Sequence, residues 1–168
     1  MAPGQINLAG DKNPFTLEQY VAVAHRHGVP VVMDCADRLP LVPNPYLSRG
    51  VDLVAYSGGK IIRGPQTAGM LLGRKDLVGA AFANSAPHHA FARAMKVSKE
   101  EVVGLVKAIE VLRTKRDRDK EDNEWRDWFR HINETVSKVP GVSGHIIEPK
   151  DRQYYPTMRV VWDPAKIG

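Results

Sequence analysis

The sequence has little of what would mark a secreted or membrane protein. It holds one cysteine, Cys35, so no disulfide can form within the chain and a reducing cytoplasm is the expected setting. No apolar run reaches the roughly 18 residues that cross a bilayer, and the N-terminus lacks the basic start and apolar stretch of a signal peptide. Aromatic residues make up 7% of the chain, while 43% hydrophobic and 26% charged residues fit a soluble globular protein with no membrane contact.

The net charge is +5 at pH 7, but positive and negative charges are nearly balanced in the segment richest in them. Between residues 113 and 130, seven basic positions (113, 115, 116, 118, 120, 126 and 130) stand against six acidic ones (117, 119, 121, 122, 124 and 127). Mixed signs at helical spacing describe a solvated helix face, whereas a phosphate-binding stripe is one-sided. We therefore expect no specific binding of tRNA. The pair His25 and His27 points in two directions on a helix, so no metal site is expected.

The first part of the chain begins with a helix and a strand over residues 13–34. Thr16 and Gln19 form a capping box, and Gly28 suits the left-handed residue that ends a helix. Residues 29–33 follow as a wholly apolar run, which predicts a strand buried on both faces.

A second helix–strand pair follows the first. It consists of a short helical piece at 46–49, stopped by Gly50, and an apolar strand at 51–56. A third strand is predicted at 67–72 and a helix at 75–84. This alternation indicates an α/β domain with a mainly parallel sheet.

From Ser98 the pattern changes to a long helical region. Ser98 and Glu101 form a second capping box, and apolar residues recur with helical period as far as Pro140-Gly141. Three aromatic side chains are expected to pack this helix against the rest of the protein: Trp125, Trp128 and Phe129. Residues 142–147 and 157–162 are predicted strands of a smaller unit. Both chain ends look cut, and the expected parts are 1–97, 98–139 and 140–168.

Polar residues stand at the ends of two of these strands. Asp34 directly follows the first strand, and Ser57-Gly58-Gly59-Lys60 directly follows the second. In open α/β sheets ligands bind at the carboxyl ends of the strands, which share one edge when the strands are parallel. The glycines let the chain approach a ligand closely, and the serine hydroxyl could contact a phosphate. A lysine facing an acid across a pocket is what pyridoxal phosphate requires.

Three segments carry a family resemblance. They are residues 31–36 (VVMDCA), 52–60 (DLVAYSGGK) and 64–69 (GPQTAG). Together they resemble the bacterial selenocysteine synthase family, the L-seryl-tRNA selenium transferases, and residues 93–101 agree. The resemblance runs from about Thr16 to Leu112 and more weakly to Trp162. It implies the second half of a fold-type-I large domain, with helices on both faces of a mainly parallel sheet, and the start of an α+β small domain.

The resemblance also implies roles for individual residues. Lys60 would bind pyridoxal phosphate through a Schiff base, and Asp34 would pair with the pyridine nitrogen. Ala36 would lie against one ring face, and Ser57 would touch the cofactor phosphate. Two further residues would shape the pocket or a subunit boundary: Gly64 and Gln66. Arg93 could bind a substrate carboxylate or phosphate, with plain surface solvation as the alternative.

The implied activity is that of a lyase, aldolase or transferase on an amino-acid or amino-sugar-acid substrate, in a homodimer or higher homo-oligomer. The family's glycine-rich phosphate turn and tRNA-binding region have no counterpart here, so we expect this chain alone to be inactive and tRNA not to be its partner. An aminotransferase or a cysteine-desulfurase-like enzyme would share Lys60 and Asp34. The alternative outside the enzymes is a non-catalytic remnant that only associates with a partner. On the simplest reading, Lys60 is a surface lysine and Asp34 a strand-end cap.

Overall fold

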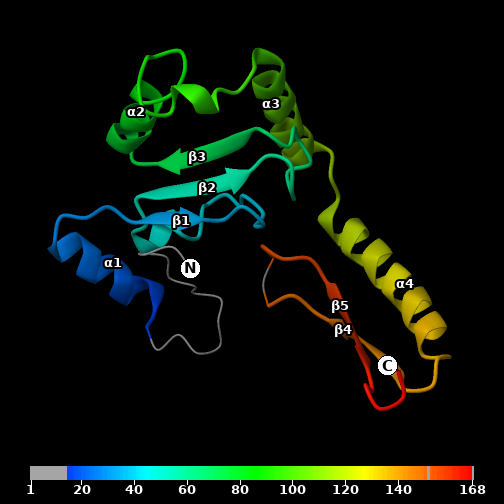
Figure 1. The fold of residues 1–168 in the computed structure, drawn as a ribbon. Coiled ribbons are helices and arrows are strands. Elements are labelled where there is room, and N and C mark those ends of the chain that lie inside the picture. The colour runs from blue at the N-terminus through cyan, green and yellow to red at the C-terminus, as the bar shows by residue number, and fades with distance from the viewer. Residues whose placement is uncertain (1–14, 151, 168) are drawn as a thin grey trace. The chain divides into compact units, whose positions relative to one another are not determined.

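The computed structural model describes residues 15–150 and 152–167, and the chain divides into two compact units (Figure 1). Unit 1 covers residues 1–106 and unit 2 covers residues 107–168. Unit 1 contains a three-stranded sheet, and unit 2 contains a two-stranded one. None of the helices in the described part of the chain is long and apolar enough to span a membrane.

Helix α1 (Leu17–Arg26) begins at the predicted capping box. The N–H of Gln19 donates to Oγ1 of Thr16 over 3.3 Å, and the N–H of Thr16 donates to Oε1 of Gln19 over 2.8 Å. The rings of Phe15 and Tyr20 meet edge to face at 5.7 Å, which closes a hydrophobic staple over the first turn. Local sequence alone therefore fixes where this helix starts.

The end of α1 determines where the first strand begins. Gly28 has a φ of +67°, its N–H donates to the carbonyl of His25, and the N–H of Val29 donates to the carbonyl of Ala24. This pattern is a Schellman motif, which takes Val29 into the helix end. Strand β1 is therefore Val32–Asp34 and not 29–33. Val29 and Val32 are 54% and 59% exposed, so the prediction of a strand buried on both faces is wrong here.

The sheet of unit 1 has the order β1-β2-β3, with β2 at Leu53–Ser57 and β3 at Gly69–Gly73. Strands β1 and β2 are parallel, with Asp34 opposite Ala55, whereas β2 and β3 are antiparallel, with Ser57 opposite Gly69. Residues 58–68 turn the chain straight back, and so short a connection produces an antiparallel neighbour. The described sheet is therefore mixed and not mainly parallel.

Helices and short turns surround this sheet. The 3-10 turn η1 (Leu47–Arg49) ends at Gly50, whose φ is +90°. Helix α2 (Lys75–Ala83) follows β3 and packs on it, and Figure 1 shows α1 and α2 on opposite sides of the three strands. A second turn, η2 (Arg93–Met95), precedes helix α3 (Lys99–Thr114).

Unit 2 is built from α4 (Arg118–Val136) and a hairpin of β4 (Val142–Ile147) and β5 (Thr157–Trp162). Both strands have the predicted bounds and pair antiparallel. The predicted long helix is two helices, because Asp117 accepts a hydrogen bond from the Lys120 N–H and starts α4 afresh.

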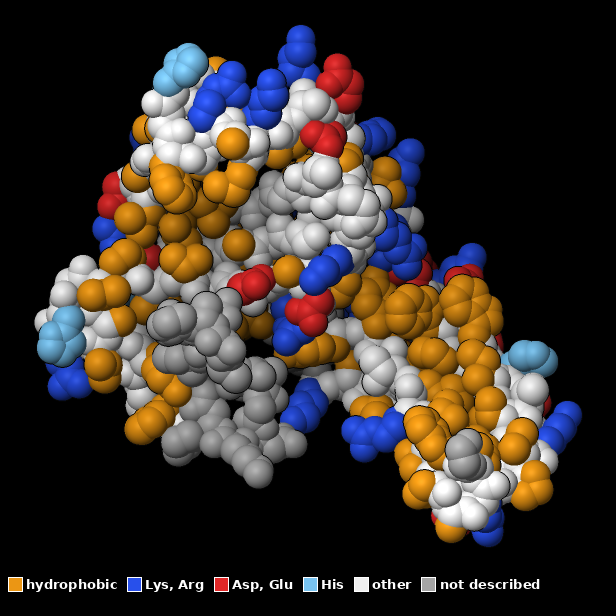
Figure 2. Space-filling model, viewed as in Figure 1, with side chains coloured by type: hydrophobic (Ala, Val, Ile, Leu, Met, Phe, Trp, Pro, Cys, Tyr) orange, Lys and Arg blue, Asp and Glu red, His pale blue; other side chains and the backbone are white. Residues whose placement is uncertain are grey.

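The aromatic side chains of α4 do not behave alike. The rings of Trp125 and Tyr155 stack at 4.7 Å, and Phe129 meets Trp125 edge to face. Trp128 is 59% exposed, so the prediction that it packs against the rest of the protein is wrong. Hydrophobic side chains accordingly remain visible on the surface that α4 and the hairpin form (Figure 2).

Candidate functional site

The parallel pairing of β1 and β2 places the ends of both strands at one edge of the sheet. Asp34 ends β1, and its Oδ1 accepts the Ala36 N–H over 3.0 Å, which is the contact of a strand-end cap. Within the described residues its second oxygen, Oδ2, accepts no hydrogen bond, and the side chain is exposed. Ser57 ends β2 and is half-buried. A carboxylate oxygen and a hydroxyl therefore lie at the same edge.

The loop at residues 58–68 joins the two glycine-containing motifs into one structure. The Gly58 N–H donates to the Ala68 carbonyl over 2.8 Å, and the Gly64 N–H donates to the Gly58 carbonyl over 2.7 Å. Nε2 of Gln66 donates to the Gly59 carbonyl over 3.1 Å. The motifs Ser-Gly-Gly-Lys and Gly-Pro-Gln are thus in direct contact, and both meet at the edge that carries Asp34.

Close packing explains why glycine stands at both positions before Lys60. A Cβ on Gly58 would lie 2.6 Å from the Ala68 oxygen, and a Cβ on Gly59 would lie 2.6 Å from Cα of Gln66. Real Cβ atoms do not approach backbone so closely, so a larger residue would displace the loop. Helix α3 adds to this packing, because a Cβ on Gly58 would also lie 2.9 Å from Leu105.

Lys60 lies on the outside of this anchored loop. Ile62, two residues later, is 2% exposed and fixes the loop to the core. The N–H of Arg63 donates to the Lys60 carbonyl over 2.9 Å, and Arg63 takes a left-handed conformation with a φ of +61°. The Lys60 side chain is exposed.

Ala36 and Cys35 follow β1 at this edge. Ala36 is half-buried. Cys35 is completely buried, and this burial raises the pKa of its thiol to about 11. A buried thiol is a poor nucleophile because the thiolate is the reactive form, so Cys35 does not supply a desulfurase nucleophile.

Arg93 lies in η2, away from the glycine loop in the sequence and half-buried. Its backbone N–H donates to the carbonyl of Ala90. Its Nε is buried and has no hydrogen-bond partner in the part of the chain that the structure describes. Among the described residues, no hydrogen bond or ion pair joins the Arg93 side chain to the loop around Lys60.

One polar centre was missed by the sequence analysis. Asp52, which precedes β2, is 4% exposed, and its Oδ2 accepts the Val31 N–H over 2.7 Å. Nε2 of His25 lies 2.8 Å from the same oxygen, and a guanidinium nitrogen of Arg74 donates to Oδ1 over 2.9 Å. Burial by itself raises the pKa of Asp52, but these hydrogen bonds outweigh it and lower the pKa to about 2. In the sequence, the only sign of this centre is that Asp52 is an acid within the apolar run at residues 51–56.

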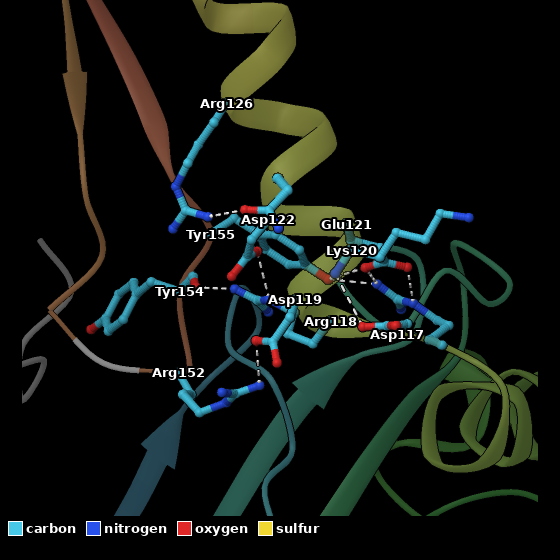
Figure 3. Close-up of polar contacts among 12 residues, drawn as sticks. Asp117, Arg118, Asp119, Lys120, Glu121, Asp122, Arg126, Arg152, Tyr154 and Tyr155 are labelled. Carbon is cyan, nitrogen blue, oxygen red and sulfur yellow. Dashed lines mark hydrogen bonds and ion pairs between the residues drawn. The ribbon is translucent and has the colours of Figure 1, made fainter.

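A second polar cluster lies in unit 2 (Figure 3). Arg116 pairs with Glu121 over 2.7 Å, and the Arg118 guanidinium lies 3.5 Å from the centre of the Tyr155 ring. Arg118 also donates to the carbonyl of Tyr154. Further ion pairs join acidic and basic residues of the region: Arg118–Asp122, Arg126–Glu148, Arg130–Asp127 and Arg152–Asp119. The basic residues of α4 are therefore largely paired within the unit.

The fold of the described residues is that of a fold-type-I pyridoxal-phosphate enzyme. The structure of D-glucosaminate-6-phosphate ammonia-lyase matches with a TM-score of 0.64 and 26% sequence identity. That match covers 98% of this chain and 42% of the lyase. The α/β fold class predicted from the sequence is confirmed, with the mixed sheet described above.

The chain belongs to the L-seryl-tRNA selenium transferase family, whose model matches residues 5–126. It is 32% identical over 152 residues to 5'-C-glycyluridine monooxygenase-decarboxylase of Streptomyces sp., covering 90% of this chain and 36% of that protein. It is 30% identical over 160 residues to L-seryl-tRNA(Sec) selenium transferase of Moorella thermoacetica, covering 89% of this chain and 29% of that protein. The family resemblance is confirmed, and the chain spans about a third of the length of these relatives.

Proposed function

We propose that this chain carries the cofactor-attachment edge of a pyridoxal-phosphate enzyme, with Lys60 as the attachment residue. The observation that carries the proposal is the loop itself. Its two motifs are hydrogen-bonded to each other, and together they present an exposed lysine beside the strand ends at Asp34 and Ser57. An ordinary surface lysine needs no such support.

The residues at this edge are of the kinds that pyridoxal phosphate needs. Lys60 offers a primary amine for covalent attachment. Asp34 offers an exposed oxygen that can pair with the pyridine nitrogen, and Ser57 offers a hydroxyl for the phosphate. Ala36 is small enough to lie against a flat ring. The contacts of Gly64 and Gln66 with the glycine pair would shape the pocket from the other side.

The chemistry divides between cofactor and protein. When bound, pyridoxal phosphate supplies an electron sink for negative charge at the substrate α carbon. The Asp34 carboxylate would hold a proton at the pyridine nitrogen by its negative charge. Nζ of Lys60 would accept and return a proton at the substrate α carbon. The buried Nε of Arg93, with no hydrogen-bond partner among the described residues, makes it our candidate for a substrate carboxylate or phosphate.

The substrate class follows from relatives as a proposal only. The names of the relatives include an ammonia lyase for D-glucosaminate 6-phosphate and a selenium transferase for L-seryl-tRNA(Sec). We propose an amino-acid or amino-sugar-acid substrate and a lyase, aldolase or transferase reaction. An aminotransferase would use the same Lys60 and Asp34. A desulfurase is disfavoured by the burial of Cys35, the only cysteine of this chain.

Visible absorbance tests the proposal. Pyridoxal phosphate added to the chain should give the band of a lysine-bound cofactor, and Lys60→Ala should remove most of it. Lys75→Ala is the matched control, because Lys75 is an exposed lysine at the start of α2. Since weak binding is expected for the chain alone, the titration extends to high cofactor concentration. Equal bands from both variants would refute the assignment of Lys60.

A further inference from the structure

Gln66 contacts the backbone immediately before Lys60. Its Nε2 donates to the Gly59 carbonyl over 3.1 Å. That carbonyl and the N–H of Lys60 belong to one planar peptide unit, which rotates only as a whole. Holding the oxygen therefore fixes the plane attached to the Lys60 Cα. The direction in which the Lys60 side chain leaves the backbone depends on this plane.

The fit between Gln66 and Gly59 is close on both sides of the hydrogen bond. A Cβ on Gly59 would lie 2.5 Å from Oε1 and 2.6 Å from Cα of Gln66. The preceding carbonyl, that of Gly58, is held by the Gly64 N–H over 2.7 Å. Two consecutive peptide units before Lys60 are thus fixed from the Gly-Pro-Gln motif, one by backbone and one by the Gln66 side chain.

Gln66 is exposed, which separates a local effect from a global one. The loss of one exposed hydrogen bond removes only a small part of the stability of a folded domain, so it does not unfold the domain. The loop retains its backbone hydrogen bonds and its anchor Ile62 without the Gln66 amide. Removal of the amide should therefore loosen the peptide before Lys60 and leave the rest of unit 1 folded.

We infer that Gln66 is a positioning residue for Lys60, which presents the lysine amine to pyridoxal phosphate in one orientation. This inference rests on the proposed function of Lys60. It requires the N–H donor of the Gln66 amide, and not only the size or polarity of the side chain. Two substitutions separate these properties. Gln66→Met keeps the length without a donor, and Gln66→Glu keeps shape and polarity but has no N–H at neutral pH.

The experiment compares two lysines in the same chain. The chain is incubated with pyridoxal phosphate, reduced with sodium borohydride and digested, and mass spectrometry gives the ratio of labelled Lys60 to labelled Lys75. In the wild-type chain Lys60 should be labelled first. Both Gln66 variants should lower the ratio about five-fold, the factor that corresponds to a typical net hydrogen bond. Thr67→Val, at the exposed neighbouring position, should keep the wild-type ratio.

Each outcome has one meaning. A lowered ratio with an unchanged midpoint of urea unfolding supports the inference. A wild-type ratio in both Gln66 variants overturns it and leaves the proposed function intact. A large fall in the urea midpoint of the Gln66 variants also overturns it, because Gln66 would then be a residue of general stability. Equal labelling of Lys60 and Lys75 in the wild-type chain contradicts the proposed function itself.

Discussion

Nε2 of His25 lies 2.8 Å from Oδ2 of Asp52, a carboxylate that is 4% exposed and stands just before β2. The same carboxylate accepts the N–H of Val31 ahead of β1 and a guanidinium N–H of Arg74 after β3. It therefore ties α1 and all three strands together. These contacts of Asp52 lie at the opposite end of β2 from Lys60, so we interpret Asp52 as a residue that stabilises the fold.

Asp52→Asn should destabilise unit 1. The substitution removes the negative charge that the half-exposed His25 and Arg74 contact, and loss of hydrogen bonds to a charged group costs about 2 kcal/mol. Urea unfolding followed by circular dichroism measures the loss. Asp76→Asn is the control, because Asp76 contacts the same Arg74 from an exposed position. An effect of Asp76→Asn as large as that of Asp52→Asn would show that burial of the carboxylate is unimportant.

The stability of the folded chain should fall at low pH because of Asp52. Its pKa is lowered from 3.8 to about 2, so the folded chain binds this proton less readily than the unfolded chain. The stabilisation is complete above about pH 4 and is lost as the pH falls towards 2. Urea midpoints between pH 6 and pH 2.5 should therefore converge for the wild-type chain and Asp52→Asn. Parallel curves down to pH 2.5 would contradict the low pKa.

Local signals in the sequence predicted element ends well where they involve near neighbours. The capping boxes at Thr16 and Ser98 are present, because both partners lie within one turn. The predicted parallel pairing of β1 and β2 is confirmed. The strand at 29–33 was misplaced, since the hydrogen bond from Val29 to Ala24 competes with sheet pairing.

Contacts between distant residues could not be predicted in the same way. Asp52 lies 27 residues from His25, and nothing in an apolar strand indicates which cation will reach its one acid. The sequence placed Gln66 at the pocket by resemblance, but its hydrogen bond to Gly59 depends on how the loop closes. The roles of Lys60, Asp34, Ala36, Ser57, Gly64, Gln66 and Arg93 remain predictions.

Binding of tRNA should be weak and without preference. Basic and acidic residues are mixed around α4, and ion pairs join Arg116 to Glu121, Arg118 to Asp122 and Arg126 to Glu148. Paired guanidinium groups must give up these partners before they contact phosphates. Filter binding at physiological salt should show no saturation below micromolar concentration. Submicromolar binding with a preference for one tRNA would contradict this prediction and support a tRNA-dependent activity.

The chain should self-associate in solution. Val160, Val161 and Trp162 are 38%, 44% and 58% exposed, and successive residues of a strand point to opposite faces, so both faces of β5 present apolar surface. Figure 2 shows hydrophobic side chains gathered on this part of the molecule. Sedimentation velocity should show dimers or larger species, and Trp162→Lys should shift them towards monomer. A monodisperse wild-type monomer would contradict this expectation.

We propose that Lys60 holds pyridoxal phosphate with Asp34 at the pyridine nitrogen. A crystal structure of the chain with pyridoxal phosphate tests it most directly, with borohydride reduction to retain the cofactor. We expect continuous density from Nζ of Lys60 to the cofactor, with an Asp34 oxygen within hydrogen-bond distance of the ring nitrogen. Density for the cofactor on another lysine, or a ring nitrogen that faces away from Asp34, would contradict it.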